Sequence, residues 1–137
     1  MMMNMKSRKV QGYNLTEILI VIAIIGILIM LALPDQTSTI SKAKALEAKT
    51  QLNHLLSLQK VHFYEKSRYS ENLEEIGFDQ QKLATEGGQA NYLIAIEEAN
   101  GSYFRATATA VADFDGDGTF NVWEIDSNSE LIEKEKD

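Results

Sequence analysis

The chain of 137 residues contains no cysteine and a single proline. Without cysteine, no disulfide can close a loop and no thiol can act as a nucleophile or a metal ligand. Basic residues are also scarce: 13 of them face 20 acidic residues, which gives a formal net charge of −7. This balance argues against direct nucleic-acid binding, because such binding depends on basic side chains that neutralise phosphates.

Residues typical of an active site are missing as well. The sequence has no glycine-rich phosphate-binding loop and no recognisable set of nucleophile, base and acid. His54 and His62 have no acidic residue at ligand spacing, so we interpret them as surface or packing residues rather than as a metal pair. We therefore expect that the protein is not an enzyme and requires no cofactor.

The most distinctive segment is an uncharged apolar run over residues 18–33, which ends before Pro34. As a helix, residues 13–34 would extend about 33 Å, enough to cross the ~30 Å hydrocarbon core of a bilayer. The preceding residues, 1–12, carry basic side chains and no acidic one. The positive-inside rule therefore predicts that this leader stays in the cytoplasm and that the rest of the chain crosses the membrane.

One carboxylate, that of Glu17, stands at the start of the apolar run. An ionisable group inside a membrane-spanning segment is costly, so its presence indicates a functional role. Two simpler interpretations leave Glu17 unexplained. One is a plain single-pass anchor, and the other is a removable secretory signal, whose cleavage site would need small residues where the chain has Met30, Leu31 and Leu33.

Together these residues resemble the N-terminus of type IV prepilins and the related pseudopilins. The family pattern is a basic leader ending in glycine, then an aromatic or methionine residue, then glutamate at the fifth position and a long apolar run. Gly12, Tyr13 and Glu17 match these positions, and Pro34 falls where many pilins carry proline. The departures are Tyr13 in place of the usual phenylalanine and Thr16 in place of an aliphatic residue.

The resemblance implies a sequence of events. Prepilin peptidase would cut between Gly12 and Tyr13 and methylate the new amine of Tyr13. Residues 13–34 would then anchor the mature subunit in the lipid of the cytoplasmic membrane, with its head outside the cytoplasm. An assembly platform would move the subunit into a helical homo-oligomeric filament, where Glu17 would pair with the Tyr13 amine of its own or a neighbouring subunit.

Three functions remain open from the sequence. The first is a pilin in a surface fibre, used for adhesion, motility or DNA uptake. The second is a pseudopilin of a type II secretion system, which forms a short periplasmic fibre. The third is a membrane-anchored binding domain that does not assemble. We favour the pilin, because the common major pseudopilins carry a proline-rich pattern after the long helix, which this chain lacks.

The remainder of the chain predicts an α+β, pilin-like fold. Residues 35–66 continue the apolar helix as an amphipathic helix, which Pro34 is expected to kink or to melt locally. Residues 67–137 are expected to form a globular β head, which packs on this long helix. The charged residues 130–137 at its end are expected to form a mobile tail.

Within the head, turn and strand signals divide the sequence into short elements. Ser70 is a suitable N-cap for a short helix over 71–76. A small antiparallel sheet of about three strands is predicted over 91–97, 102–111 and 119–125. The dipeptide Asn100–Gly101 between the first two strands is a strong signal for a hairpin turn.

A second candidate site lies between the second and third predicted strands. Its spacing matches an EF-hand calcium loop, in which oxygen ligands occupy alternate positions and a glutamate closes the loop. The corresponding residues here are Asp113, Asp115, Asp117, Thr119 and Glu124. Strand-like flanks would carry Glu124 away from the loop, however. Two interpretations therefore remain: a Ca²⁺ site that closes the C-terminal hairpin in place of the disulfide found in many pilins, or a solvated Asp/Gly turn.

Overall fold

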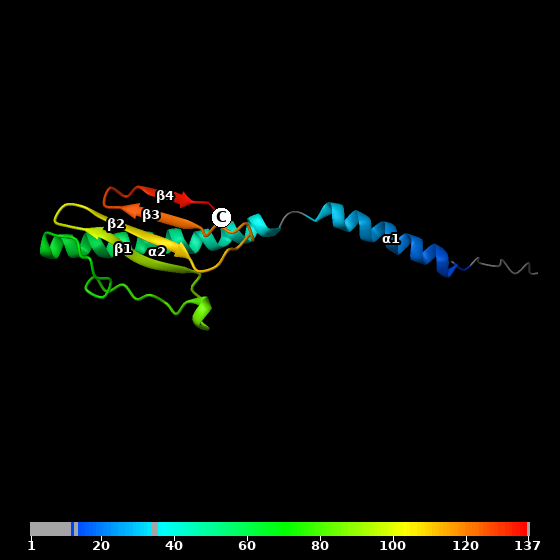
Figure 1. The fold of residues 1–137 in the computed structure, drawn as a ribbon, viewed down its shortest axis with the longest axis horizontal. Coiled ribbons are helices and arrows are strands. Elements are labelled where there is room, and N and C mark those ends of the chain that lie inside the picture. The colour runs from blue at the N-terminus through cyan, green and yellow to red at the C-terminus, as the bar shows by residue number, and fades with distance from the viewer. Residues whose placement is uncertain (1–11, 13, 34–35, 137) are drawn as a thin grey trace, which may run out of the picture. The chain divides into compact units, whose positions relative to one another are not determined.

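The computed structural model describes residues 12, 14–33 and 36–136, which fall into two units divided after Asp35 (Figure 1). The first unit contains helix α1, Leu15–Ala32. None of its residues is buried, and its large apolar side chains are 44% to 80% exposed. A helix that is apolar on every side is stable when lipid or other apolar helices surround it. Among the described residues, one helical stretch, which begins at Leu15, is long and apolar enough to cross a membrane.

Helix α1 ends at Ala32, and the next residue, Leu33, is extended with φ −67° and ψ 117°. The residue before a proline is sterically driven out of the helical region, which explains this end. The kink predicted at Pro34 itself lies outside the described residues. The second unit then begins with helix α2, Gln36–Lys66.

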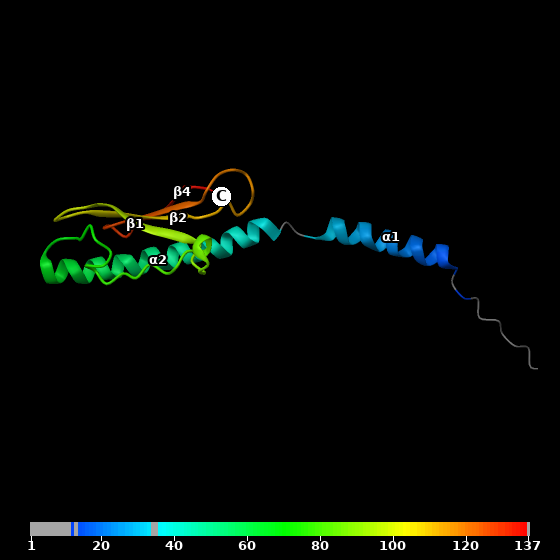
Figure 2. The same ribbon diagram turned by 60° about the horizontal axis from the view of Figure 1, so that its bottom comes forward.

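The second unit packs α2 against one face of an antiparallel sheet, so that helix and sheet form two layers (Figure 2). The sheet has four strands in the order of the chain. They are β1 (Tyr92–Ala99), β2 (Phe104–Ala110), β3 (Val122–Asp126) and β4 (Leu131–Glu135), and a short 3-10 helix, η1 (Ala84–Glu86), precedes them. The predicted α+β, pilin-like fold is thereby confirmed.

The core lies between α2 and the sheet. The apolar face of α2 contributes Ala48, Leu52, Leu55 and Leu56, all buried. The sheet contributes larger side chains from β1, from β3 and from Phe104 at the start of β2, and a row of small ones from the rest of β2, namely Ala106, Ala108 and Ala110. The four buried side chains of α2 pack against this apolar face of the sheet. Each fully buried leucine contributes about 1.5–3 kcal/mol of transfer free energy.

The fourth strand was not predicted, and the expectation of a mobile tail over 130–137 is wrong for residues up to Glu135. Leu131 and Ile132 pair with Ile125 and Glu124 of β3. The reversal between the strands depends on Asp126, whose carboxylate accepts the N–H groups of Asn128 and Glu130 at 2.9 and 3.0 Å. The charged composition of β4 is that of an exposed edge strand, where charges discourage pairing with other chains.

The short helix predicted over 71–76 is also absent, and turns take its place. The Ser70 hydroxyl accepts the N–H of Asn72 at 3.0 Å, and the Asn72 side chain accepts the N–H of Glu74 at 2.8 Å. Such local side-chain bonds offer the backbone an alternative to the helical ladder. Gly77 ends the turns with a left-handed φ of 76°.

A buried amide fastens this turn segment to α2. Gln59 has no exposed surface, and its side chain donates to the Ser70 carbonyl at 2.7 Å and accepts the Ser70 N–H at 2.9 Å. The Ser70 hydroxyl in turn donates to Glu75 at 2.6 Å. Arg68 and His62 also approach the Glu75 carboxylate, at 3.2 and 3.5 Å. These contacts position the segment that leads from α2 to the sheet.

Candidate functional site

The first candidate site is the start of α1, where Glu17 occupies the first helical turn. Asn14 is the N-cap, with extended φ and ψ, and its backbone N–H donates to the Glu17 carboxylate at 3.3 Å. This bond satisfies an N–H group at the helix end, and a negative charge there also complements the helix dipole. Glu17 therefore has a role in the isolated chain as a helix-capping residue.

The neighbours of Glu17 on the helix surface are apolar. Ile18, Val21 and Ile22 surround it, and each is at least 44% exposed. If lipid or another helix covered this surface, the carboxylate would be removed from water as well. An unpaired buried carboxylate is strongly unfavourable, so such a covered state needs a cationic partner close to Glu17.

The predicted cleavage junction is described only in part. Gly12 is exposed, and a side chain added to it would meet no atom within 4 Å. It precedes the first residue of α1, Leu15, so it is outside the helical hydrogen-bond ladder. Tyr13 lies outside the described residues. Cleavage, methylation and a Glu17–Tyr13 pair therefore stay predictions.

The second candidate site is the loop between β2 and β3. Oxygen atoms of Asp113, Asp115 and Asp117 lie within 4.8 Å of one another. The Asp113 carboxylate accepts the N–H groups of Gly118 and Gly116 at 2.6 and 2.8 Å. These bonds lower the pKa of Asp113 below its usual value, and the bond from Gly118 has the largest effect. Three of the five proposed calcium ligands are thus brought together.

The other two proposed ligands make different contacts. Thr119 contributes a backbone N–H bond to the Asp117 carboxylate, at 2.7 Å. Glu124 lies on β3, 3.1 Å from the Lys134 ammonium and 3.9 Å from the Arg105 guanidinium. The strand therefore carries Glu124 into an ion-paired group on the sheet rather than to the loop. Calcium binding stays a prediction that rests on the three aspartates.

Asn121, which the calcium-loop spacing places at the ninth position, fastens the C-terminal region. Asn121 is 2% exposed, and its amide donates to the Glu133 carboxylate at 2.7 Å and to the Glu135 carbonyl at 2.9 Å. The Tyr92 hydroxyl donates to its carbonyl oxygen at 2.7 Å. One side chain thus joins β1 and β4 to the segment before β3. Its partners are 12, 14 and 29 residues away, so no local pattern reveals them.

The fold and the first site define a class of protein. An exposed apolar helix with one carboxylate in its first turn, followed in sequence by a helix packed on an antiparallel sheet, is a pilin-like arrangement. In agreement, the chain is 47% identical over 68 residues to the type IV major pilin protein PilA of Myxococcus xanthus (strain DK1622). The match spans 50% of this chain but 31% of that relative. No protein-family model matches the chain. The similarity confirms the predicted resemblance to type IV pilins.

Proposed function

We propose that this chain is the precursor of a structural subunit of a type IV pilus-like filament. The observation that carries the proposal is helix α1, which buries none of its apolar residues within the chain and presents Glu17 in its first turn. An apolar surface of this extent requires a cover, which lipid provides before assembly and neighbouring α1 helices provide afterwards. The similarity to a major pilin supports the filament over a plain anchor.

Processing by a prepilin peptidase is the first step of the proposed function. The peptidase cuts between Gly12 and Tyr13 and methylates the new amine. The position of Gly12 supports this step, since Gly12 precedes the first turn of α1 and a side chain added to it would meet no atom within 4 Å. The basic leader, residues 1–12, stays on the cytoplasmic side, and the head lies outside the cytoplasm.

Assembly is the second step, and Glu17 has the central role in it. An assembly platform transfers the subunit from the membrane to a filament in which α1 helices cover one another. The carboxylate then loses water and needs a positive partner. The Tyr13 amine, created by cleavage directly before the N-cap Asn14, is the partner we propose, either in the same subunit or in a neighbour. This pairing would also fix the axial register between subunits.

Intact-mass spectrometry of two fractions tests the proposal: filaments sheared from native cells, and washed membranes. We expect an abundant species that starts at methylated Tyr13 in the sheared filaments. The same species confined to membranes would instead favour a pseudopilin or a minor subunit. A chain that still starts near Met1 in both fractions would refute the processing step and the role given to Glu17.

A further inference from the structure

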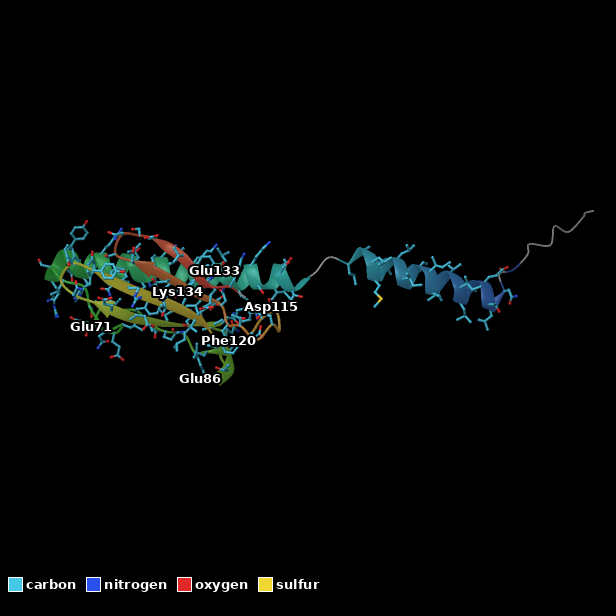
Figure 3. All side chains as sticks on the ribbon, turned by 45° about the horizontal axis from the view of Figure 1, so that its top comes forward. Glu71, Glu86, Asp115, Phe120, Glu133 and Lys134 are labelled. Atoms are coloured by element: carbon cyan, nitrogen blue, oxygen red, sulfur yellow. The ribbon has the colours of Figure 1, made fainter. Side chains whose placement is uncertain are left out.

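The two edges of the sheet are protected unequally. On β4, the exposed charged residues Glu133, Lys134 and Glu135 discourage pairing with another strand. The middle of β1, from Ile94 to Ile96, carries no charge. Figure 3 shows Glu133 and Lys134 near β4, whereas Glu71, beside the β1 edge, lies towards the end of the head opposite Asp115.

The side chain of Gln80 already forms hydrogen bonds with part of the β1 edge, as a neighbouring strand would. The amide of Gln80 donates to the Tyr92 carbonyl at 3.2 Å and accepts the Ile94 N–H at 2.9 Å. Outward-facing groups repeat every second residue of a strand, so the next pair consists of the Ile94 carbonyl and the Ile96 N–H. In the described part of the chain, neither group is bonded to a turn, a loop or a side chain.

A groove of about 760 Å³ lies beside these groups. Its accessible apolar lining comes from the half-buried Leu73, Ala95 and Ile96, whereas Phe78 and Ile94 are 4% and 3% exposed. Its polar lining includes three carboxylates, those of Glu71, Glu74 and Asp79, and no lysine or arginine. The groove thus combines unpaired strand groups, an apolar floor and a negative rim. Past Ile96 a β-bulge interrupts the register of β1, which limits the usable edge to a short segment.

We propose that this groove binds an extended, basic peptide segment of a partner protein, which adds to the sheet beside β1. The segment continues the hydrogen bonds that Gln80 begins, with the Ile94 carbonyl and the Ile96 N–H as its main-chain partners. An apolar side chain of the segment covers Leu73, and its lysine or arginine side chains face Glu71 and Glu74. In strand addition of this kind, the main-chain hydrogen bonds supply affinity. The carboxylates at the rim of the groove favour a positively charged partner.

A second copy of the head fits this groove poorly. The four strands of the sheet contain two basic residues, Arg105 on β2 and Lys134 on β4. Both approach Glu124 of their own chain, at 3.9 and 3.1 Å. A net-acidic head would moreover repel the negative rim of its neighbour. The charge of the groove therefore favours a separate basic partner over self-association.

The test uses the full chain in nonionic detergent micelles and a short fluorescent peptide in which lysine alternates with valine. A peptide in which glutamate alternates with valine is its matched control. We expect saturable binding of the lysine peptide, measured by anisotropy, and at least ~10-fold weaker binding of the glutamate peptide. Equal binding of both peptides, or saturable binding of neither, overturns the proposal.

Backbone N-methylation separates strand addition from simple charge attraction. Two methylated lysine peptides are compared, each lacking N–H groups along one edge. The peptide methylated on the edge that faces β1 should lose at least ~10-fold in affinity, while the other should bind like the parent. The Ile96 amide should also shift in the NMR spectrum on binding and exchange more slowly with solvent. Equal affinity of the two methylated peptides would overturn strand addition.

A pair of charge variants tests the rim. Glu71→Lys with Glu74→Lys should weaken the lysine peptide roughly 3- to 10-fold, because both side chains are exposed and their interactions are screened. Glu65→Lys with Glu130→Lys makes the same change in net charge at exposed positions outside the groove and should leave affinity unchanged. Equal losses in both double variants would show that net charge, not the groove, attracts the peptide.

Discussion

Replacing Gln59 by leucine should lower the stability of the head more than any change of similar size on the exposed face of α2. The side chain is fully buried, and its amide uses both its donor and its acceptor on the backbone of Ser70. Leucine has a similar volume but can form neither bond. Because Ser70 is itself 1% exposed, water cannot easily replace the lost amide.

The expected loss of stability follows from these two unsatisfied groups. A buried N–H or carbonyl left without a partner costs about 1–3 kcal/mol. The additional apolar carbon of leucine returns about 1 kcal/mol. We therefore expect the Gln59→Leu head to be destabilised by about 3 kcal/mol. For a unit of this size, that corresponds to a decrease in Tm of roughly 12–24 °C.

Thermal unfolding of the full chain in nonionic detergent measures this effect. The fluorescence of Trp123, the single tryptophan of the chain, reports on the head without interference from α1. Asn53→Leu is the matched control, since it also replaces an amide by leucine on α2 but at an exposed position. A Gln59→Leu variant that melts within a few degrees of the control would refute the reasoning, because it would mean that the Ser70 groups find other partners.

Four further predictions concern the candidate sites and the pH dependence. Glu17→Ala should leave cleavage intact but block incorporation into filaments, as measured by N-terminal mass and by shearing; normal filaments would contradict the proposed pairing. Gly12→Phe should leave the leader attached, and a mutant chain that starts at Tyr13 would refute the junction. If the aspartate loop binds calcium, saturating Ca²⁺ at about 100-fold above Kd should stabilise the head by about 2.7 kcal/mol, and Asp113→Asn should abolish that gain; an unchanged Tm with Ca²⁺ or EDTA favours the solvated turn. The hydrogen bond from Ser70, together with Arg68, holds the pKa of Glu75 below its reference value of 4.5. Its stabilising contribution is therefore present above that pH and is lost as pH falls through the lowered pKa, so Glu75→Gln should flatten the fall in Tm below about pH 4.5.

The elements that the sequence predicted well are those with a local signal. Helix α1 follows from an uninterrupted apolar run, and α2 from apolar residues at three- and four-residue steps. The β1–β2 hairpin follows from two β-rich segments around Asn100–Gly101, and β3 from alternating residues that end at Ile125. In each case, the residues that specify the element lie within it.

The features that escaped prediction depend on partners far along the chain. The charged sequence of β4 is typical of a solvated tail. It forms a strand because it pairs with Ile125 and Trp123 of β3. The sequence around Asn121 is typical of a loop, and the fastening role of Asn121 follows only from its hydrogen bonds with Tyr92 and Glu133. Glu124 matches a calcium-loop position, yet Lys134 competes for it. Spacing within the loop cannot reveal such competition, because it arises from the pairing of strands.

The hydrogen bonds by which Asn121 fastens β4 affect the conditions under which the head can fold. A disulfide in that place would require an oxidant before the fold is complete, and a reductant could open it again. Hydrogen bonds from one amide form as soon as the strands meet, with no electron transfer. The head should therefore reach its final form at the same rate in oxidising and reducing surroundings. Any cysteine introduced as a label would moreover be the single thiol in the chain.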